Sequence, residues 1–186
     1  MEITNEDNMK LMSRYKDNYF DLAIVDPPYN IKSWSATGNH SLSQKEIDKL
    51  KSWESEPKQE YFNELFRVSK NQIIWGANHF FDFLGKATTF ICWDKKNRNC
   101  HFADAELGWT SFKNGKVTIF DNYKKTSGNR IHPTQKPVKL YEWLLDKYAK
   151  ENDKILDTHL GSGSIAIACH NLGYDLTACE LDQEYY

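Results

Sequence analysis

The 186-residue sequence has no apolar run of the length that a membrane span requires, which is about 20 residues. Its first ten residues, MEITNEDNMK, also have no apolar segment of the kind that secretory signals contain. A membrane partner is therefore not expected, and we predict that the protein is cytoplasmic.

Cysteine is scarce as well. Cys92, Cys100, Cys169 and Cys179 form no C-x-x-C pair, and their spacing is not typical of zinc ligands. The pattern therefore favours free thiols in a reducing compartment, without a disulfide framework and without a metal site.

A large excess of positive charge is also missing, because the net charge is -2 and the isoelectric point is near 6.3. Any contact with nucleic acid must therefore be local. Phosphates could bind at the lysine-rich segment 112–132 or at the basic cluster of Lys95, Lys96 and Arg98. The length and a hydrophobic content of 40% predict a single domain, 1–186.

Apolar runs alternate with helical patterns along the chain. Strands are predicted in the runs 20–26, 71–77, 88–94, 154–160 and 175–181. Two helical stripes between them are interpreted as core and not as binding sites: Tyr61, Phe62, Leu65 and Phe66, and then Val138, Tyr141, Leu144 and Leu145. This alternation indicates an α/β fold with a mostly parallel sheet.

Two segments depart from this alternation. The pair Asn114-Gly115 separates two β-prone runs, 108–113 and 116–123, and predicts a two-residue hairpin near one edge of the sheet. The long polar stretch 31–59 contains Ser43 and Glu46, which together indicate a capping box and a short helix. Because such a long connection is unusual in a compact domain, we predict a flexible or DNA-facing loop.

The run AIVDPPYN ends a predicted strand at a rigid turn. Two successive prolines, Pro27 and Pro28, fix the backbone after Asp26, so the Asp26 carboxylate and the Pro27 carbonyl are two acceptors held still. Tyr29 adds a flat ring. This set suits an exocyclic amino group on a planar base, although an ordinary turn with a capping aspartate would have the same sequence.

A second candidate site follows a later strand. Gly161, Ser162 and Gly163 begin a G-x-G-x-x-A pattern, and Glu180 ends the next apolar run. An acidic side chain there can accept hydrogen bonds from ribose hydroxyls, so the two features indicate an adenosine-type cofactor. An NAD-dependent dehydrogenase uses the same parts, but it would need further βαβ units after Glu180.

Three motifs in one order, DPPY, HPTQKP and DTHLGSGS, resemble those of the DNA amino-methyltransferases in the permuted β-type order. The resemblance extends over nearly the whole chain. It implies a Rossmann-like, S-adenosyl-L-methionine-dependent methyltransferase fold with a mostly parallel seven-stranded sheet, an antiparallel hairpin and a circularly permuted motif order. It also implies that DNA is the substrate, at adenine N6 or cytosine N4. Asp26 is more typical of the adenine enzymes.

The resemblance also assigns site residues. Asp26, Pro27, Pro28 and Tyr29 would form the catalytic motif. The residues expected at the cofactor are Asp7, Asn8, Asp26, Thr134, Lys136, Asp157, His159, Gly161, Ser162, Gly163 and Glu180. Among them, Asp7 would contact the adenine moiety of the cofactor, and Thr134 and Lys136 its carboxylate. Two simpler interpretations stay open, namely that Asp7 caps a helix and that HPTQKP merely begins one.

The sequence departs from the family pattern in two places. His159 replaces an aromatic residue that is usual in the motif D-P-F-x-G, and few residues separate the hairpin from HPTQKP, where relatives often insert a recognition region. Recognition would then fall to the loop 31–59 and to Lys124, Lys125 and Arg130. The chain also ends soon after Glu180, as expected for a truncated or minimal form.

Several alternatives remain open at this stage. They are a cytosine-N4 methyltransferase, a methyltransferase of RNA or protein amides, and an inactive cofactor-binding module. The sequence leaves the oligomeric state and the recognised DNA site undetermined.

Overall fold

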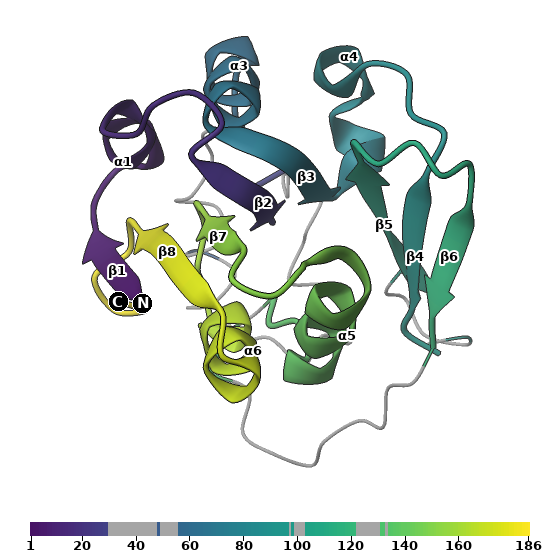
Figure 1. Ribbon diagram of the computed structural model, residues 1–186. Helices are drawn as coiled ribbons and strands as arrows, with labels where there is room; N and C mark the ends of the chain where they lie inside the picture. The colour runs from purple at the N-terminus through teal and green to yellow at the C-terminus, as the bar shows by residue number, and fades with distance from the viewer. Residues whose placement is uncertain (30–47, 49–55, 97, 99–102, 122–130, 133) are drawn as a thin grey trace.

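The computed structural model describes residues 1–29, 48, 56–96, 98, 103–121, 131, 132 and 134–186 (Figure 1). Most of the predicted loop 31–59, including its capping box, lies outside the described residues. The same holds for Cys100 and for Lys124, Lys125 and Arg130.

The described elements confirm the alternation of strands and helices. The strands are β1 (Glu2–Asn5), β2 (Phe20–Val25), β3 (Ser69–Trp75), β4 (Phe90–Asp94), β5 (Ala105–Thr110), β6 (Val117–Phe120), β7 (Lys154–Asp157) and β8 (Asp175–Glu180). The helices are α1 (Asn8–Ser13), α3 (Gln59–Val68), α4 (Phe81–Leu84), α5 (Val138–Tyr148) and α6 (Ser164–Leu172), with a 3₁₀ turn, η1 (Ala77–His79).

The strands form one sheet in the order β1-β8-β7-β2-β3-β5-β4-β6. β5 runs antiparallel to β3 and β4, and the other neighbouring pairs are parallel. Among the described residues the sheet has eight strands, where seven were expected. The strand β1 pairs with β8, so the two ends of the chain meet at one edge of the sheet.

The predicted hairpin between β5 and β6 is wrong, because β4 lies between these two strands. The antiparallel pair at this edge is β4 with β5. The Oγ1 of Thr89 donates to the Asn114 side chain at 2.8 Å and accepts from the Asn114 and Gly115 amides at 3.1 and 3.2 Å. Since Thr89 directly precedes β4, this anchor carries the chain from β5 across to the outer side of β4.

Helices cover both faces of the sheet, α1, α3 and α4 on one and α5 and α6 on the other (Figure 1). In β2 the run 22–25 is apolar on both faces, because each face packs against helices. Leu22 and Ile24 pack in the cluster with α5 and α6, whereas Ala23 and Val25 pack in the cluster with α1 and α3. Both predicted helical stripes lie in these two clusters.

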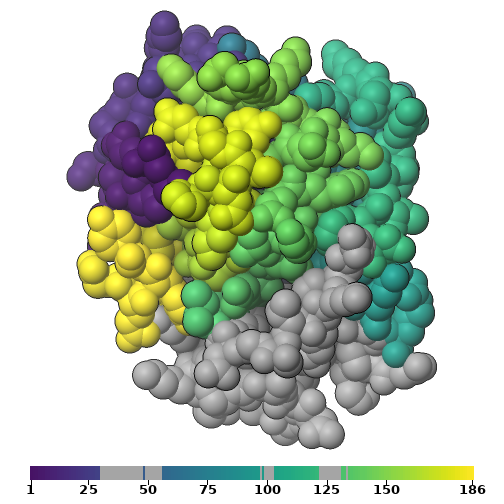
Figure 2. Space-filling view, turned by 60° about the horizontal axis from the view of Figure 1, so that its bottom comes forward, coloured from purple at the N-terminus to yellow at the C-terminus, as the bar shows by residue number. Residues whose placement is uncertain are grey.

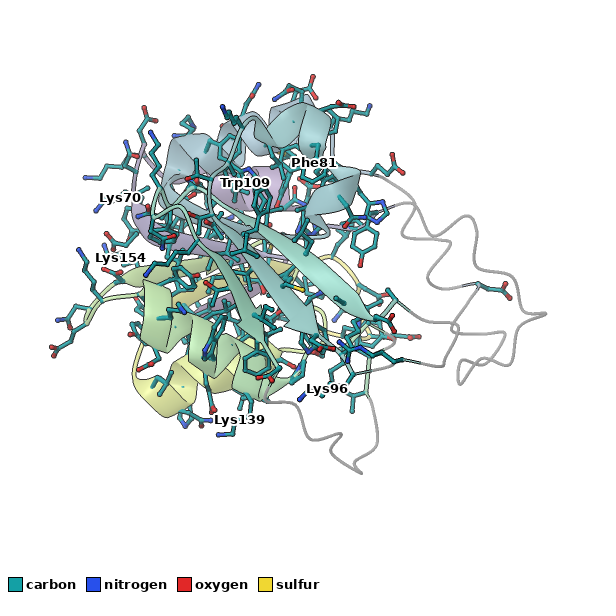
Figure 3. The ribbon with its side chains drawn as sticks, turned by 90° about the vertical axis from the view of Figure 1, so that its right-hand side faces the viewer. Lys70, Phe81, Lys96, Trp109, Lys139 and Lys154 are labelled. Atoms are coloured by element: carbon teal, nitrogen blue, oxygen red, sulfur yellow. The ribbon has the colours of Figure 1, made fainter. Side chains whose placement is uncertain are left out.

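The parallel strands begin at one end of the sheet and finish at the other. In Figure 3, Lys70 and Lys154 mark the end at which β3 and β7 begin, and Lys96 follows the end of β4. Figure 2 shows the purple N-terminal and yellow C-terminal segments side by side. The turns that follow β1, β2, β7 and β8 therefore meet at one edge, where ligands bind in open α/β sheets. Of the described helices, none is long and apolar enough to cross a membrane.

Candidate active site

A cavity of about 590 Å³ lies at the carboxyl ends of β1, β2, β7 and β8. This volume is typical of small-molecule sites. The structure brings most of the predicted site residues to its wall. They are Asp7, Asn8, Asp26, Pro27, Pro28, Tyr29, Thr134, Lys136, His159, Gly161, Ser162 and Glu180.

Asp26 directly follows β2, whose buried run carries its carboxylate to the edge of the cavity. Oδ2 accepts a hydrogen bond from the Nζ of Lys136 at 2.5 Å. Oδ1 is buried and has no hydrogen-bond partner among the described residues. Burial raises the pKa of Asp26, the nearby Lys136 ammonium opposes the rise, and the Glu106 carboxylate adds to it. A buried acceptor without a partner is a candidate contact for a bound substrate.

The Tyr29 ring lies beside this carboxylate and is held in place from two sides. It stacks on the His79 ring with centroids 4.4 Å apart and an interplanar angle of 10°. A Cβ at Gly76 would lie 2.6 Å from the Tyr29 ring, and Gly76 has a φ of 69°. Glycine is therefore required at the end of β3, both for its left-handed backbone and for the close approach of the ring.

Lys136 is almost fully buried, with 3% of its side chain exposed, and two carboxylates surround its ammonium group. Besides Asp26, it contacts the Oε2 of Glu106, in β5, at 3.0 Å. Lys95 forms a further ion pair with Glu106. Lys136 therefore lies at the cavity as predicted, but its ammonium group forms ion pairs with two carboxylates of the protein.

Thr134, the other residue predicted at the cofactor carboxylate, lies on the loop before α5. Its hydroxyl and its backbone amide lie 3.2 and 3.3 Å from the Nδ1 of His132. His132 is buried and lines the cavity next to Gly161. HPTQKP therefore does more than begin the helix, because three of its residues form part of the cavity wall.

The glycine loop after β7 curves around the Glu180 carboxylate. The Oε2 of Glu180 accepts the Gly161 amide at 2.7 Å, and Oε1 accepts the Asp182 amide at 2.8 Å. Glu180 thus fixes the loop and still faces the cavity. Gly163 has a φ of 69° at the N-cap of α6, a backbone conformation that glycine adopts without strain.

The segment after β1 completes the wall. Asp7 caps α1, because its side chain accepts hydrogen bonds from the amides of Met9 and Lys10 at 2.9 and 3.2 Å. The simpler interpretation is therefore confirmed, and the contact with a cofactor stays a prediction. The side-chain amide of Asn8 lies 3.0 Å from the Nε2 of His159. Burial lowers the pKa of His159 to about 3, so the ring is neutral, and its Nδ1 lies 2.9 Å from the Thr158 hydroxyl.

Comparison with known proteins agrees with this geometry. A family model described as DNA methylase matches residues 41–186, which is most of the chain. The chain belongs to the DNA methylase family.

The Type II methyltransferase M2.LlaDCHI of Lactococcus lactis subsp. cremoris is 25% identical to this methylase, over 98% of this chain and 85% of the relative. The alignment has 234 positions against 186 residues, so the relative carries insertions that this methylase lacks.

Two solved structures share the fold. The M1.HpyAVI–SAM complex is 20% identical, with a TM-score of 0.63 and coverage of 99% of this chain and 95% of that chain. The PvuII DNA methyltransferase, described as cytosine-N4-specific, is 13% identical, with a TM-score of 0.64 and coverage of 98% and 82%. At these identities the likeness establishes the fold of the methylase and no more.

Two predicted cofactor residues of the methylase, Asp157 and Gly163, are not among the residues that line the cavity. Asp157 is buried, and its Oδ1 accepts the His159 amide at 2.9 Å. Burial raises the pKa of Asp157 to about 7. Asp157 thus orders the backbone of the loop at His159, and Gly163 forms the N-cap of α6.

Sequence reasoning missed several residues that form the site. Tyr61 and Tyr141 were interpreted as core only, but both also line the cavity, and the Tyr61 hydroxyl lies 2.7 Å from the Thr158 hydroxyl. Glu106 and His79 were not singled out. Glu106 lies two residues before the β-prone run 108–113, outside every predicted strand, and its partner Lys136 is 30 positions away in the sequence, so no local signal pointed to it.

The basic cluster that was considered for DNA phosphates is paired with carboxylates in the methylase. Lys95 contacts Glu106, Lys96 lies 3.5 Å from Asp121, and Arg98 lies 2.7 Å from Asp94. Lys96 and Arg98 are more than half exposed, and such ion pairs are weak enough for phosphates to compete. Only Lys95 is largely buried, so it is the least suited of the three to contact DNA.

Proposed function

We propose that this DNA methylase transfers the methyl group of S-adenosyl-L-methionine to the N6 amino group of an adenine that has left the DNA duplex. The observation that carries the proposal is the buried Oδ1 of Asp26, which has no partner among the described residues. It lies on the rigid turn after β2, in a cavity shared with the glycine loop and Glu180. The family and the relatives named above support the same chemistry.

The cofactor half of the cavity consists of the segments after β1, β7 and β8. Glu180 would accept hydrogen bonds from the ribose hydroxyls, as an acidic residue does after the second strand of many nucleotide sites. The chain would turn closely around the ligand at Gly161 and Ser162, with Asp7 and Asn8 at the adenine end. His159 is neutral and would offer a flat ring. The bound cofactor supplies a methyl group on a positively charged sulfur.

The predicted contact of Lys136 and Thr134 with the carboxylate of the cofactor remains a proposal. The Lys136 ammonium has three N–H donors, of which one is hydrogen-bonded to Asp26 Oδ2, and Glu106 Oε2 lies 3.0 Å from Nζ as an ion pair. The remaining donor capacity would be available to a ligand carboxylate.

The target half of the cavity consists of Asp26, Pro27, Pro28 and Tyr29. Leaving the duplex costs an adenine a few kcal/mol of pairing and stacking, and the Tyr29 ring offers a stacking face in return. Asp26 Oδ1 and the Pro27 carbonyl would accept hydrogen bonds from the two amino N–H groups, which aims the nitrogen lone pair at the methyl group. Both acceptors also stabilise the positive charge that develops on nitrogen. The transfer is then direct and needs no covalent enzyme intermediate.

Cytosine N4 is the second candidate target. Its amino group also presents two N–H donors, and the PvuII methyltransferase shares the fold of this chain. We favour adenine because the acceptor here is a carboxylate, whereas serine is more typical of the cytosine enzymes that the motifs resemble.

We further propose that residues 1–186 act as one catalytic domain, since the described strands all belong to one sheet. The segment 31–59 would face the DNA. The cytoplasmic location and the oligomeric state stay predictions, which fractionation and light scattering can test.

The function is tested by incubating the protein with methyl-labelled S-adenosyl-L-methionine and separate samples of unmethylated DNA, RNA and protein. We expect label in DNA, recovered as N6-methyladenine after digestion to nucleosides. Label in RNA or protein alone would overturn the DNA substrate. Label on cytosine would overturn only the choice of base.

A further inference from the structure

Four side chains of alternating charge run from the rim of the sheet to the candidate catalytic carboxylate. Lys95, after β4, pairs with Glu106 in β5, which lies 3.0 Å from the Nζ of Lys136. Lys136 in turn lies 2.5 Å from Asp26. The four residues come from segments far apart in the sequence and are at most 20% exposed at the side chain.

Without Lys95, the other three side chains, Asp26, Lys136 and Glu106, carry a net negative charge. Asp26 and Glu106 are two carboxylates that share one buried ammonium group, that of Lys136. A like charge at this range disfavours ionisation, so one of the two carboxylates would tend to hold a proton. A protonated Asp26 would be a poor acceptor for an amino group.

Lys95 restores the balance from the outer side. Although burial opposes the charge on Glu106, Lys136 and Lys95 together hold its pKa below the usual range. The Lys136 ammonium is retained as well, because Asp26 and Glu106 raise its pKa well above the ordinary value despite its burial. With two cations for two carboxylates, the Lys136 ammonium can neutralise the Asp26 carboxylate while the Lys95 ammonium neutralises the Glu106 carboxylate.

We propose that Glu106 and Lys95 are positioning residues for the reaction. Glu106 holds the Lys136 ammonium beside Asp26 Oδ2, and Lys95 balances the charge of Glu106, so that Asp26 stays ionised with Oδ1 directed into the cavity. The inference rests on the proposed function, because it assigns Asp26 as the acceptor for the target amino group. It adds two residues that do not touch the substrate, and it gives Lys136 a role on the target side of the cavity.

The other titratable groups that interact with Asp26 electrostatically are Tyr29, Tyr61, Tyr141 and Asp157. Burial raises the pKa of each of the three phenols, so they stay neutral over the working range. Asp157 has a pKa of about 7 and therefore titrates in that range. Its signal must be separated from that of Asp26.

The test uses two substitutions with opposite predicted effects. Glu106→Gln removes the negative charge that disfavours ionisation of Asp26. The acid limb of the plot of single-turnover rate against pH should therefore move to lower pH by about one unit. Lys95→Met removes the balancing positive charge, so the limb should move to higher pH by about one unit. On this limb one pH unit corresponds to about a tenfold change in rate at fixed pH.

Lys139→Met is the matched control, because Lys139 is 79% exposed and pairs with Glu142 on α5 (Figure 3). It removes the same charge from the whole molecule and should leave the profile in place. If Lys95 acted only by binding DNA, Lys95→Met would raise the KM for DNA without moving the pH profile of the saturated enzyme. That result would overturn the proposal.

A second measurement makes the network testable even if the proposed function fails. The carboxyl ¹³C signal of Asp26, assigned by its loss in Asp26→Asn, reports the titration of Asp26 directly and apart from Asp157. Its midpoint should fall in Glu106→Gln and rise in Lys95→Met. Unchanged midpoints in folded variants, or shifts in the same direction, would contradict the role of the network whatever the enzyme methylates.

Discussion

The two oxygens of the Asp26 carboxylate have different surroundings. Oδ2 is bound by the Lys136 ammonium, and Oδ1 is buried without a partner in the described part of the chain. The first contact orients the group, and the second oxygen remains available to a substrate. Nothing in the local sequence DPPY specifies this division, because Lys136 is 110 positions away.

The ion pair leads to a prediction about stability. Asp26→Ala leaves the buried Lys136 with Glu106 as its remaining carboxylate, and we expect a loss of about 3 kcal/mol in the free energy of unfolding. Asp26→Asn keeps an oxygen that can accept from Nζ and should cost about 1 kcal/mol. Urea denaturation of both variants measures the difference. Equal losses would show that the ion pair does not contribute to the fold.

Tyr29 gives a second prediction at this scale. Tyr29→Ala removes the stacking face and should weaken capture of the target base by roughly 1 to 3 kcal/mol, which raises the KM for DNA and lowers turnover. Tyr29→Phe keeps the face that His79 orients and should stay within a few-fold of the parent. Steady-state rates across a range of DNA concentrations compare the two. If alanine and phenylalanine behave alike, the ring is not a stacking platform.

At the scale of the element, most of the strands were predictable, although β1 was not among the predicted runs, and their order was not predictable. Runs such as FDLAIV are apolar on both faces because helices cover both sides of the sheet, so their sequence alone identifies them as buried strands. The Asn114-Gly115 turn gave a false hairpin, since its partner is the Thr89 hydroxyl and not the opposite strand. Long-range anchors of this kind leave no local pattern.

The glycine loop is an element whose shape depends on one carboxylate. Glu180 accepts amides of Gly161 and Asp182, one on each oxygen. We predict that Glu180→Gln, which retains one of these acceptors, weakens binding of S-adenosyl-L-methionine by roughly 1 to 3 kcal/mol, or about 5- to 150-fold. Isothermal titration calorimetry measures the affinity, and circular dichroism checks the fold. An unchanged dissociation constant would remove Glu180 from the cofactor site.

The end of β7 provides a prediction about pH. The pKa of Asp157 is raised from 3.8 to about 7, so the native state binds a proton more tightly than the unfolded chain does. The contribution of Asp157 to stability is therefore complete below the unfolded value and is lost as the pH rises toward 7. Asp157→Asn removes this loss and keeps an acceptor for the His159 amide.

We expect the stability of Asp157→Asn relative to the parent to increase by up to about 1.4 kcal/mol for each pH unit between 4 and 7. Urea denaturation at several pH values gives both curves. Parallel curves would mean that Asp157 titrates alike in the folded and unfolded states.

At the scale of the whole molecule, the fold joins two halves of a site. The segments after β1, β7 and β8 form one side of the cavity, and the segment after β2 forms the other. Because β1 pairs with β8, residues from the two ends of the chain contribute to the same wall. The order of motifs predicted this closure, but Glu106 and His79 entered the site only through the packing of β5 and η1 against the rest.

The central claim is that Asp26 accepts a hydrogen bond from an adenine amino group during methyl transfer. The most direct test compares the parent with Asp26→Asn in single turnover, with labelled S-adenosyl-L-methionine and DNA, followed by separation of the methylated nucleosides. We predict that the parent produces N6-methyladenine and that the single-turnover rate of Asp26→Asn is at least about 10²-fold lower. The cofactor affinity of Asp26→Asn should stay within a few-fold of the parent. Transfer by Asp26→Asn at the parent rate, or a methyl group on cytosine N4 in the parent, would contradict it.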